Sequence, residues 1–277
     1  TGTSSKVTGG KIDNSGINYV VTANTGVSVG SYTNSPTLLS TTHANATFGP
    51  SNKVNPISFT SDDTFFAGST TDSTIYICKI TPQVSPYITH IYTSIAIGGT
   101  IMDMVWMGDD LIVFSQVIAT LEAKITIYSF NRTSYNVSIK QASMVSPYPI
   151  YLPQVAKISE NRFVVSSTYL GGEINLMDFT YNSNGTLTSN IVGGSVANNT
   201  TGGAPLSKVN YPYIAYPCLN RQACVVRRSS QSPVVFDYIA SSDSFSRSAT
   251  KYPAISGDKI FPHGSGKIYS GGSFFSL

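Results

Sequence analysis

The fold of this chain is decided by residues 159–167, which read Ser-Glu-Asn-Arg-Phe-Val-Val-Ser-Ser. A short polar turn comes first, three apolar residues follow it, and a second apolar run occupies residues 174–179. Short apolar runs separated by Gly, Asn or Asp are typical of antiparallel strands joined in hairpins. The stretch therefore predicts a hairpin of two short strands, and no helical pattern of ten residues or more stands out in the chain.

Variants of this hairpin occur six times in the 277 residues. Further extended runs precede and follow most copies, such as residues 57–59 before the second and residues 137–144 after the third. This arrangement predicts four short antiparallel strands per copy, at a spacing close to that of propeller blades. The six copies occupy residues 15–32, 61–80, 108–130, 159–179, 220–239 and 264–275.

We therefore predict an all-β chain with a single domain over residues 1–277, folded as a six-bladed β-propeller. The middle strands carry three or four apolar residues in a row, which suits sheets packed on both faces by neighbouring blades. A pair of tandem β-sandwiches is the alternative, although sandwiches require no fixed period.

The sixth copy is incomplete, because only eight residues follow Tyr269. We expect an N-terminal strand containing Lys6, Val7 and Thr8 to close the last blade and cover its free edge. Completion by a neighbouring molecule is the alternative, and it would produce a polymer through strand addition.

The composition limits the classes of partner. Only 11% of the residues are charged, against about 25% in an ordinary soluble domain, and the net charge is +3. Arg227 and Arg228 form the only adjacent basic pair, and no basic stripe with interleaved aromatic residues is present, so nucleic-acid binding is not expected. No apolar run reaches the 18 or so residues of a membrane helix, so no membrane span is expected.

Two features predict an extracellular or cell-surface protein. The first is a set of Asn-X-Ser/Thr acceptor sites for N-linked glycans. Most of them fall in predicted turns or between predicted strands, where a covalent N-glycan would be exposed. The acceptor residues are Asn45, Asn131, Asn136, Asn184, Asn198 and Asn199.

The second feature is a pair of cysteines, Cys218 and Cys224, with five residues between them. Such a pair in a turn and strand is typical of a small disulfide loop, which persists in oxidising surroundings. Two unpaired buried thiols are the alternative. Cys78 stands alone in an apolar run and is predicted to be a small core residue.

No cluster of residues predicts a reaction, a metal site or a cofactor. The three histidines, His43, His90 and His263, lie in different copies of the repeat and have no metal-ligand spacing. The pairs at residues 62–63 and 109–110 are both Asp-Asp and occupy equivalent turns. Aspartate is a preferred turn residue that bonds its own backbone, so a turn role is favoured over acid–base chemistry or Ca²⁺ binding.

Two short motifs resemble known propeller repeats. Residues 19–24, Tyr-Val-Val-Thr-Ala-Asn, followed by Val-Ser-Val at 27–29, are similar to the YVTN-type repeat of surface-layer propellers. Residues 267–272, Lys-Ile-Tyr-Ser-Gly-Gly, resemble a kelch repeat. The usual kelch Trp is missing, since the only Trp, Trp106, precedes the motif of its copy. The resemblance implies a propeller fold and carries over no catalytic residue.

These observations predict a secreted, N-glycosylated, non-enzymatic structural protein of an extracellular assembly, such as a filament subunit, a surface-layer component or an adhesin. Self-association into a polymer or surface layer is the expected partnership. One alternative is a carbohydrate- or receptor-binding propeller head, in which the tyrosine-rich loops at residues 147–151 and 211–217 stack on sugars. A second is a hydrolase or lyase with its site in the central channel, which would leave no local motif.

Overall fold

The computed structural model describes residues 7–12, 18–23, 26–32, 36–40, 56–69, 74–80, 88–96, 99–116, 123–145, 153–168, 174–192, 213–215, 223–227, 234–249, 261–263, 267–270 and 273–275. Side chains are described only for parts of this set, between residues 56 and 249. The chain divides into two compact units, Thr1–Val145 and Ser146–Leu277.

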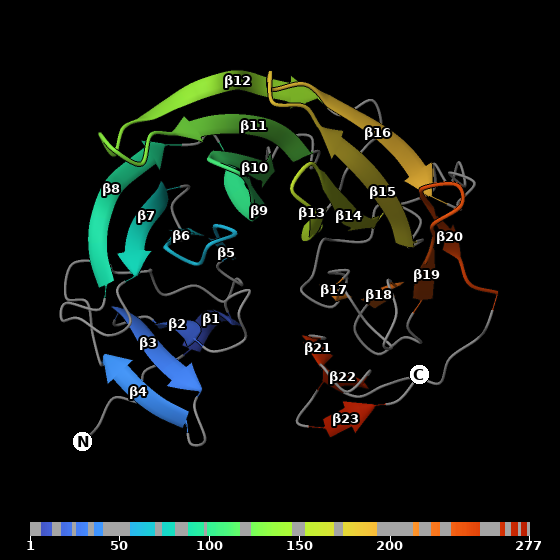
Figure 1. Ribbon diagram of the computed structural model, residues 1–277, viewed down its shortest axis with the longest axis horizontal. Helices are drawn as coiled ribbons and strands as arrows, with labels where there is room; N and C mark the ends of the chain where they lie inside the picture. The colour runs from blue at the N-terminus through green and yellow to red at the C-terminus, as the bar shows by residue number, and fades with distance from the viewer. Residues whose placement is uncertain are drawn as a thin grey trace. The chain divides into compact units, whose positions relative to one another are not determined.

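The first unit contains three four-stranded antiparallel sheets, in each of which consecutive strands are neighbours (Figure 1). Their strands are β1 (Val7–Ile12), β2 (Asn18–Ala23), β3 (Gly26–Tyr32) and β4 (Pro36–Ser40); β5 (Ile57–Phe59), β6 (Phe65–Ser69), β7 (Thr74–Ile80) and β8 (Ile88–Ala96); and β9 (Thr100–Met107), β10 (Asp110–Gln116), β11 (Ala123–Phe130) and β12 (Val137–Val145).

The second unit contains two four-stranded sheets and one three-stranded sheet, again with consecutive strands side by side. Their strands are β13 (Gln154–Ser159), β14 (Arg162–Thr168), β15 (Ile174–Tyr181) and β16 (Leu187–Val192); β17 (Tyr213–Ala215), β18 (Ala223–Arg227), β19 (Val234–Ile239) and β20 (Ser244–Arg247); and β21 (Phe261–His263), β22 (Lys267–Ser270) and β23 (Ser273–Phe275).

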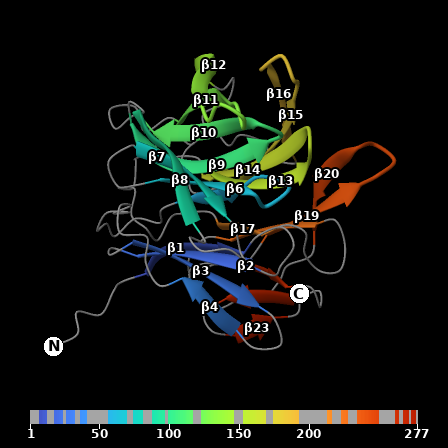
Figure 2. The same ribbon diagram turned by 60° about the vertical axis from the view of Figure 1, so that its left-hand side comes forward.

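The sheet β9–β12 shows why an uninterrupted apolar run forms a strand here. Every residue of β10 is buried. β9 and β11 pair with its two edges, and its Leu111 and Val113 pack in one apolar cluster with Phe65 of the neighbouring sheet. The turn before it needs a positive φ at Gly108 (63°), a conformation that glycine adopts without a steric cost. β12 follows β11 across the sheet in both views (Figures 1 and 2). Its central residues, from Ser138 to Ala142, are exposed.

Within the first unit, neighbouring sheets pack face to face. β5 lies against both β1 and β9. One apolar cluster contains Phe65 of β6 together with Trp106 and Leu111 of the next sheet. Trp106 is fully buried, and its Nε1 donates a hydrogen bond to the carbonyl of Ser58 at 3.1 Å. This bond satisfies a buried polar group while it joins two sheets.

The second unit is organised in the same way. β17 lies against β13 and β21. A buried cluster joins Val164 and Leu176 of one sheet to Phe236 and Phe245 of the next. The rings of Phe163 and Phe179, which occupy paired positions on β14 and β15, stack at 5.1 Å.

The predicted strand pattern is confirmed. The six hairpins expected from sequence are β2–β3, β6–β7, β10–β11, β14–β15, β18–β19 and β22–β23. The described residues contain strands and turns but no helix, and among them no helix is long and apolar enough to cross a membrane. A single domain over residues 1–277 stays a prediction.

The predicted closure of the last blade is corrected. Val7 and Thr8 belong to β1, which pairs with β2 at the edge of the first sheet. Among the described residues, the sheet β21–β22–β23 contains three strands, and β1 is not one of them. β1 is the edge strand of the sheet β1–β4. The segment that the sequence prediction assigned to the sixth blade is therefore part of the first. Lys6 lies outside the described residues.

Candidate functional site

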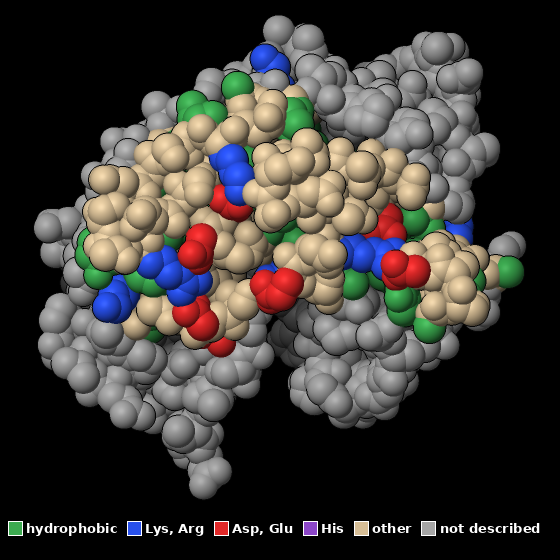
Figure 3. Space-filling model, turned by 45° about the horizontal axis from the view of Figure 1, so that its top comes forward, with side chains coloured by type: hydrophobic (Ala, Val, Ile, Leu, Met, Phe, Trp, Pro, Cys, Tyr) green, Lys and Arg blue, Asp and Glu red, His purple; other side chains and the backbone are tan. Residues whose placement is uncertain are grey.

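The exposed turns of the sheets carry most of the polar chemistry that the structure describes. In Figure 3, basic and acidic side chains occur in small mixed groups and not in patches of one sign. Two of these groups have an arginine at the centre. We call them the Arg132 cluster (Arg132, Asp62, Asp109 and Phe65) and the Arg162 cluster (Arg162, Asp178, Asp243, Tyr238 and Phe245).

The Arg132 cluster joins two neighbouring sheets of the first unit. Arg132 lies in the turn between β11 and β12, and its Nε and Nη1 donate to Asp109 and Asp62, both at 2.5 Å. Asp62 belongs to the β5–β6 turn and Asp109 to the β9–β10 turn. The guanidinium also lies over the ring of Phe65, 5.5 Å from its centroid. One side chain thereby connects the turns of two sheets.

Hydrogen bonds within the β5–β6 turn also hold the carboxylate of Asp62. Asp62 Oδ1 accepts from the hydroxyl of Thr60 at 2.7 Å and from the backbone N–H of Thr64 at 3.3 Å. Burial raises the pKa of Asp62, but the hydrogen bonds from Thr60, Arg132 and Thr64 outweigh it and lower the pKa to about 2. The group is therefore an ionised acceptor and not a proton donor near neutral pH.

The hairpin that carries Arg132 is fixed by its first residue. Asn131 Oδ1 accepts from the backbone N–H groups of Thr133 and Ser134, each at 2.9 Å. The backbone N–H of Asn131 donates to the carbonyl of Asn136 at 2.9 Å, which closes the turn. Tyr135 adopts a φ of 58° and stacks on Phe130 with 6.5 Å between the ring centroids.

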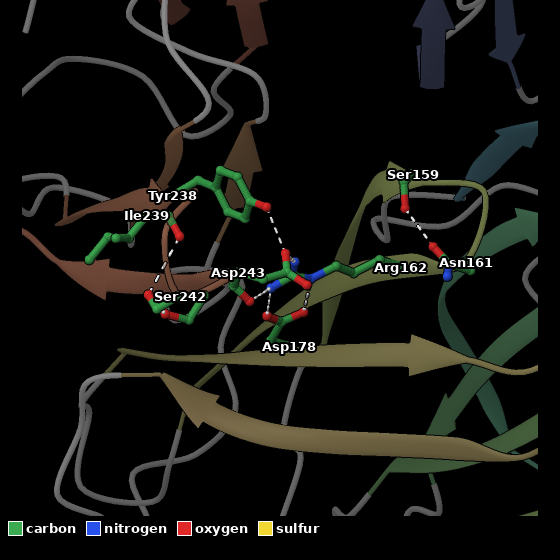
Figure 4. Close-up of polar contacts among 9 residues, drawn as sticks. Ser159, Asn161, Arg162, Asp178, Tyr238, Ile239, Ser242 and Asp243 are labelled. Atoms are coloured by element: carbon green, nitrogen blue, oxygen red, sulfur yellow. Dashed lines mark hydrogen bonds and ion pairs between the residues drawn. The ribbon is translucent and has the colours of Figure 1, made fainter.

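The Arg162 cluster joins two neighbouring sheets of the second unit (Figure 4). Arg162, at the start of β14, forms a two-point ion pair with Asp178 of β15, with Nε 2.8 Å from Oδ1. It also pairs with the carboxylate of Asp243 and donates to the Asp243 carbonyl at 2.9 Å. Asp243 belongs to the β19–β20 turn and adopts a φ of 47°. This contact links the turn to the sheet beside it.

Aromatic side chains complete the Arg162 cluster. The guanidinium lies 5.4 Å from the ring centroid of Tyr238 and 5.6 Å from that of Phe245. The Tyr238 hydroxyl donates to Asp243 at 2.6 Å. This bond lowers the pKa of Asp243 and raises that of Tyr238, and the bonds to Asp178 raise the pKa of Arg162 against the effect of burial. All these shifts favour the charged pair over proton transfer.

The chemistry of both clusters is that of structural ion pairs. Each carboxylate of the two clusters is bonded to a guanidinium group. Within the described part of the chain, no group of three His, Cys, Asp or Glu side chains could hold a metal ion. Both clusters therefore connect sheets.

The Asp-Asp pairs lie at equivalent places, between the first and second strands of their sheets, as predicted, although only Asp109 of the second pair is in the turn itself. Asp63 adopts a φ of 57° in its turn, and Asp110 begins β10 and pairs with Lys140 Nζ at 2.6 Å. Sequence reasoning missed Arg132 as the partner of Asp62 and Asp109, and it missed the Arg162 cluster altogether. For Arg162 the available signal was an arginine at the repeat position where the third copy carries Asp110.

The predicted glycan sites are placed only in part. Asn131, Asn136 and Asn184 lie on exposed turns, at β11–β12 and β15–β16. Five of the residues named from the sequence lie outside the described residues: His43, Asn45, Asn198, Asn199 and Cys218. Cys224, His90 and His263 lie in β18, β8 and β21, where only the backbone is described. The Cys218–Cys224 disulfide thus stays a prediction.

Cys78 occupies β7 and is completely buried. It packs against Phe59 and Phe66 in a small apolar cluster. Burial raises the pKa of its thiol well above the ordinary value. The predicted role as a core residue is confirmed.

Neither a protein-family model nor the sequence of a curated protein matches this chain. Solved structures are similar in fold. A periplasmic gluconolactonase of Pseudomonas aeruginosa has a TM-score of 0.62 at 10% identity, over 94% of this chain and 77% of that one. A chain of a mitotic checkpoint complex has a TM-score of 0.61 at 12% identity, over 100% and 76% of the two chains.

A third structure, the WD40 repeats of RRP9, has a TM-score of 0.52 at 10% identity, over 97% of this chain and 87% of that one. At these identities the similarity concerns the fold alone. It favours a β-propeller over tandem sandwiches. The closer resemblance to YVTN-type and kelch repeats stays a prediction.

Proposed function

We propose that this chain is an extracellular, N-glycosylated, non-enzymatic structural protein, built as a six-bladed propeller and used in a filament, a surface layer or an adhesin. The observation that carries the proposal is the position of the acceptor asparagines. Asn131, Asn136 and Asn184 all lie on exposed turns between the third and fourth strands of a sheet. Turns at this position can hold a bulky glycan without disturbing the buried strands.

The use of charge supports a structural role. Only 11% of the residues are charged, and several of the described charged side chains are engaged in ion pairs within a unit. Such a surface offers mainly hydroxyl and amide groups to its surroundings. It suits close packing of neighbouring molecules, because few charges must be desolvated on contact.

Self-association through strand addition is the proposed mode of assembly. The sheet β21–β22–β23 has one strand fewer than the other sheets among the described residues. A strand at the edge of a sheet presents backbone N–H and C=O groups that another chain can pair with. A second copy of this chain is the proposed partner at β23. A Cys218–Cys224 disulfide, also proposed here, would suit an oxidising extracellular setting.

Mass spectrometry of the protein purified from its native source tests the glycoprotein part of this proposal. Intact masses are compared before and after enzymatic or chemical removal of N-glycans, and again after reduction and alkylation. We expect a mass above that of the polypeptide that falls on deglycosylation, and two cysteines that become alkylated only after reduction. A native protein with the bare polypeptide mass and three free thiols would overturn the extracellular glycoprotein proposal.

A further inference from the structure

We propose that the described turns carry glycans at Asn131 and Asn184 and none at Asn136. This inference rests on the proposed function, since it presupposes that the protein meets an N-glycosylation system. All three residues satisfy the acceptor sequence and all three are exposed. The local geometry of the hydroxyl residue two positions later separates them.

Asn184 lies in a turn that brings its side chain to the hydroxyl of its own acceptor sequence. Its Oδ1 accepts from the backbone N–H of Thr186 at 3.0 Å and from the Thr186 hydroxyl at 2.7 Å. Gly185, between them, adopts a φ of 93°, which allows this close return of the chain. Within the described part of the chain, Nδ2 of Asn184 makes no hydrogen bond, so the nitrogen that would be modified is available.

Asn131 shares one feature with Asn184: its side-chain oxygen accepts from the backbone N–H of the hydroxyl residue two positions later. Its Oδ1 is used by the backbone N–H groups of Thr133 and Ser134, and its Nδ2 makes no hydrogen bond among the described residues. The central residue of this acceptor sequence is Arg132, whose side chain reaches away to Asp62 and Asp109. A glycan on Nδ2 therefore leaves intact both the bonds that hold the turn and the ion pairs between the sheets.

Asn136 is placed differently. Its carbonyl accepts from the Asn131 N–H, and the two residues that follow it enter β12. Ser138 is paired with Ser129 of β11. In a strand, residues two positions apart are separated by about 6.5 Å along the chain. The ladder thus holds the hydroxyl of Ser138 away from the Asn136 amide, and strand pairing would have to break to bring them together.

The chemistry of transfer explains why this distance matters. A carboxamide nitrogen is a weak nucleophile, and the need for a hydroxyl two residues later implies that the transferase binds both groups together. The co-reactant is a saccharide activated as a phosphate or diphosphate ester. The Asn Nδ2–C1 bond forms, the C1–O bond to phosphate breaks with its electron pair leaving on the phosphate, and one amide proton passes to a base of the transferase. Turns that already fold the hydroxyl residue back toward the asparagine need the smallest rearrangement.

Steric crowding between glycans also disfavours modification of Asn136. Asn131 and Asn136 are joined by a backbone hydrogen bond of 2.9 Å across one hairpin turn. Two branched saccharides attached at this separation would compete for the same space. A glycan at Asn131 therefore disfavours a second one at Asn136.

Site-resolved mass spectrometry of glycopeptides from the native protein and from variants expressed in the same host tests this inference. N131D and N184D, which keep the Oδ1 acceptor of the turn, are each expected to lose the mass of one glycan. N136D is expected to leave the glycan mass unchanged. T133V removes the hydroxyl but keeps the backbone donor to Asn131, so it should also remove one glycan, whereas T133S should retain it.

The outcomes separate the inference from the proposal beneath it. A glycan on Asn136, or bare Asn131 or Asn184 in a protein glycosylated elsewhere, would overturn the inference and leave the extracellular glycoprotein proposal standing. No glycan on any asparagine would overturn both. Should N131D fail to fold, the T133V and T133S pair still decides the occupancy of Asn131.

Discussion

The Arg132 and Arg162 clusters use the same parts in different surroundings. Each arginine pairs with one carboxylate of its own sheet and one from the turn of a neighbouring sheet, and each lies over an aromatic ring. The Arg132 side chain is 31% exposed and its partners are about half exposed. The Arg162 and Asp178 side chains are only 12% and 11% exposed. The difference shows how burial decides the contribution of similar ion pairs, because water screens the Arg132 pairs and hardly reaches the pair between Arg162 and Asp178.

The largest effect is expected from R162M. Methionine keeps much of the stem that packs on the aromatic rings but leaves the Asp178 carboxylate without its two-point partner in a nearly buried position. Removing one partner of such a pair is expected to cost about 3 kcal/mol in the free energy of unfolding. Denaturant titration of the variant and the wild type measures it. R162K, which keeps the charge without the two-point geometry, should lie between them.

A smaller effect is expected from R132M. Its carboxylate partners can return to water when the arginine is removed, so the loss is about 1 kcal/mol, part of it from the contact with Phe65. The same titration measures it, and added salt should reduce the difference from wild type. A loss as large as that of R162M would contradict the dependence on burial.

The pH dependence of the Arg132 cluster has a definite sign. The pKa of Asp62 falls from its ordinary 3.8 to about 2 in the folded protein. The stabilisation from this carboxylate is therefore complete above about pH 5 and is lost as the pH falls from about 4 to 2. The difference in unfolding free energy between wild type and R132M should stay constant from pH 7 to 5 and shrink below pH 4. A difference that grew in acid would show that Asp62 is not the linked group.

The smallest effect is expected from D243N. Asp243 is 75% exposed, and asparagine tolerates the positive φ of this position and can still accept from Tyr238. We expect the unfolding midpoint of this variant to match that of the wild type at moderate salt, because so exposed an ion pair contributes little. A double-mutant cycle with R162M measures the coupling between the two sheets. A coupling free energy as large as the whole effect of R162M would mean that the turn contact, and not the Asp178 pair, dominates the cluster.

The strands of this molecule could be predicted from the sequence, but the ion pairs between neighbouring sheets could not. Three or four consecutive apolar residues bounded by Gly, Asn or Asp mark buried strands such as β10 and β14, because that pattern is local. Arg132 and Asp62 are 70 residues apart, so their contact depends on the packing of neighbouring sheets. The terminal strand was assigned to the wrong sheet for a similar reason: a short polar segment such as residues 6–8 carries no signal that specifies its partner.

The sequence identifies the candidate glycosylation sites, but it does not tell which of them are expected to carry a glycan. The acceptor pattern is the same at Asn131, Asn136 and Asn184. Only the hydrogen bonds of the turns distinguish them, and Thr186 contributes its hydroxyl in one case while Ser138 is paired within a strand in another. Side-chain bonds of this kind depend on where a strand begins, which a pattern locates only to within a few residues.

Electron microscopy of the purified native protein tests the structural role most directly. We expect ordered filaments or sheets in which the edge of β23 contacts a second copy, and we expect a substitution that blocks strand pairing there, such as F274P, to disperse them. A monodisperse monomer that binds a defined saccharide on a glycan array, or that hydrolyses one, would contradict the structural role in favour of a binding head or an enzyme.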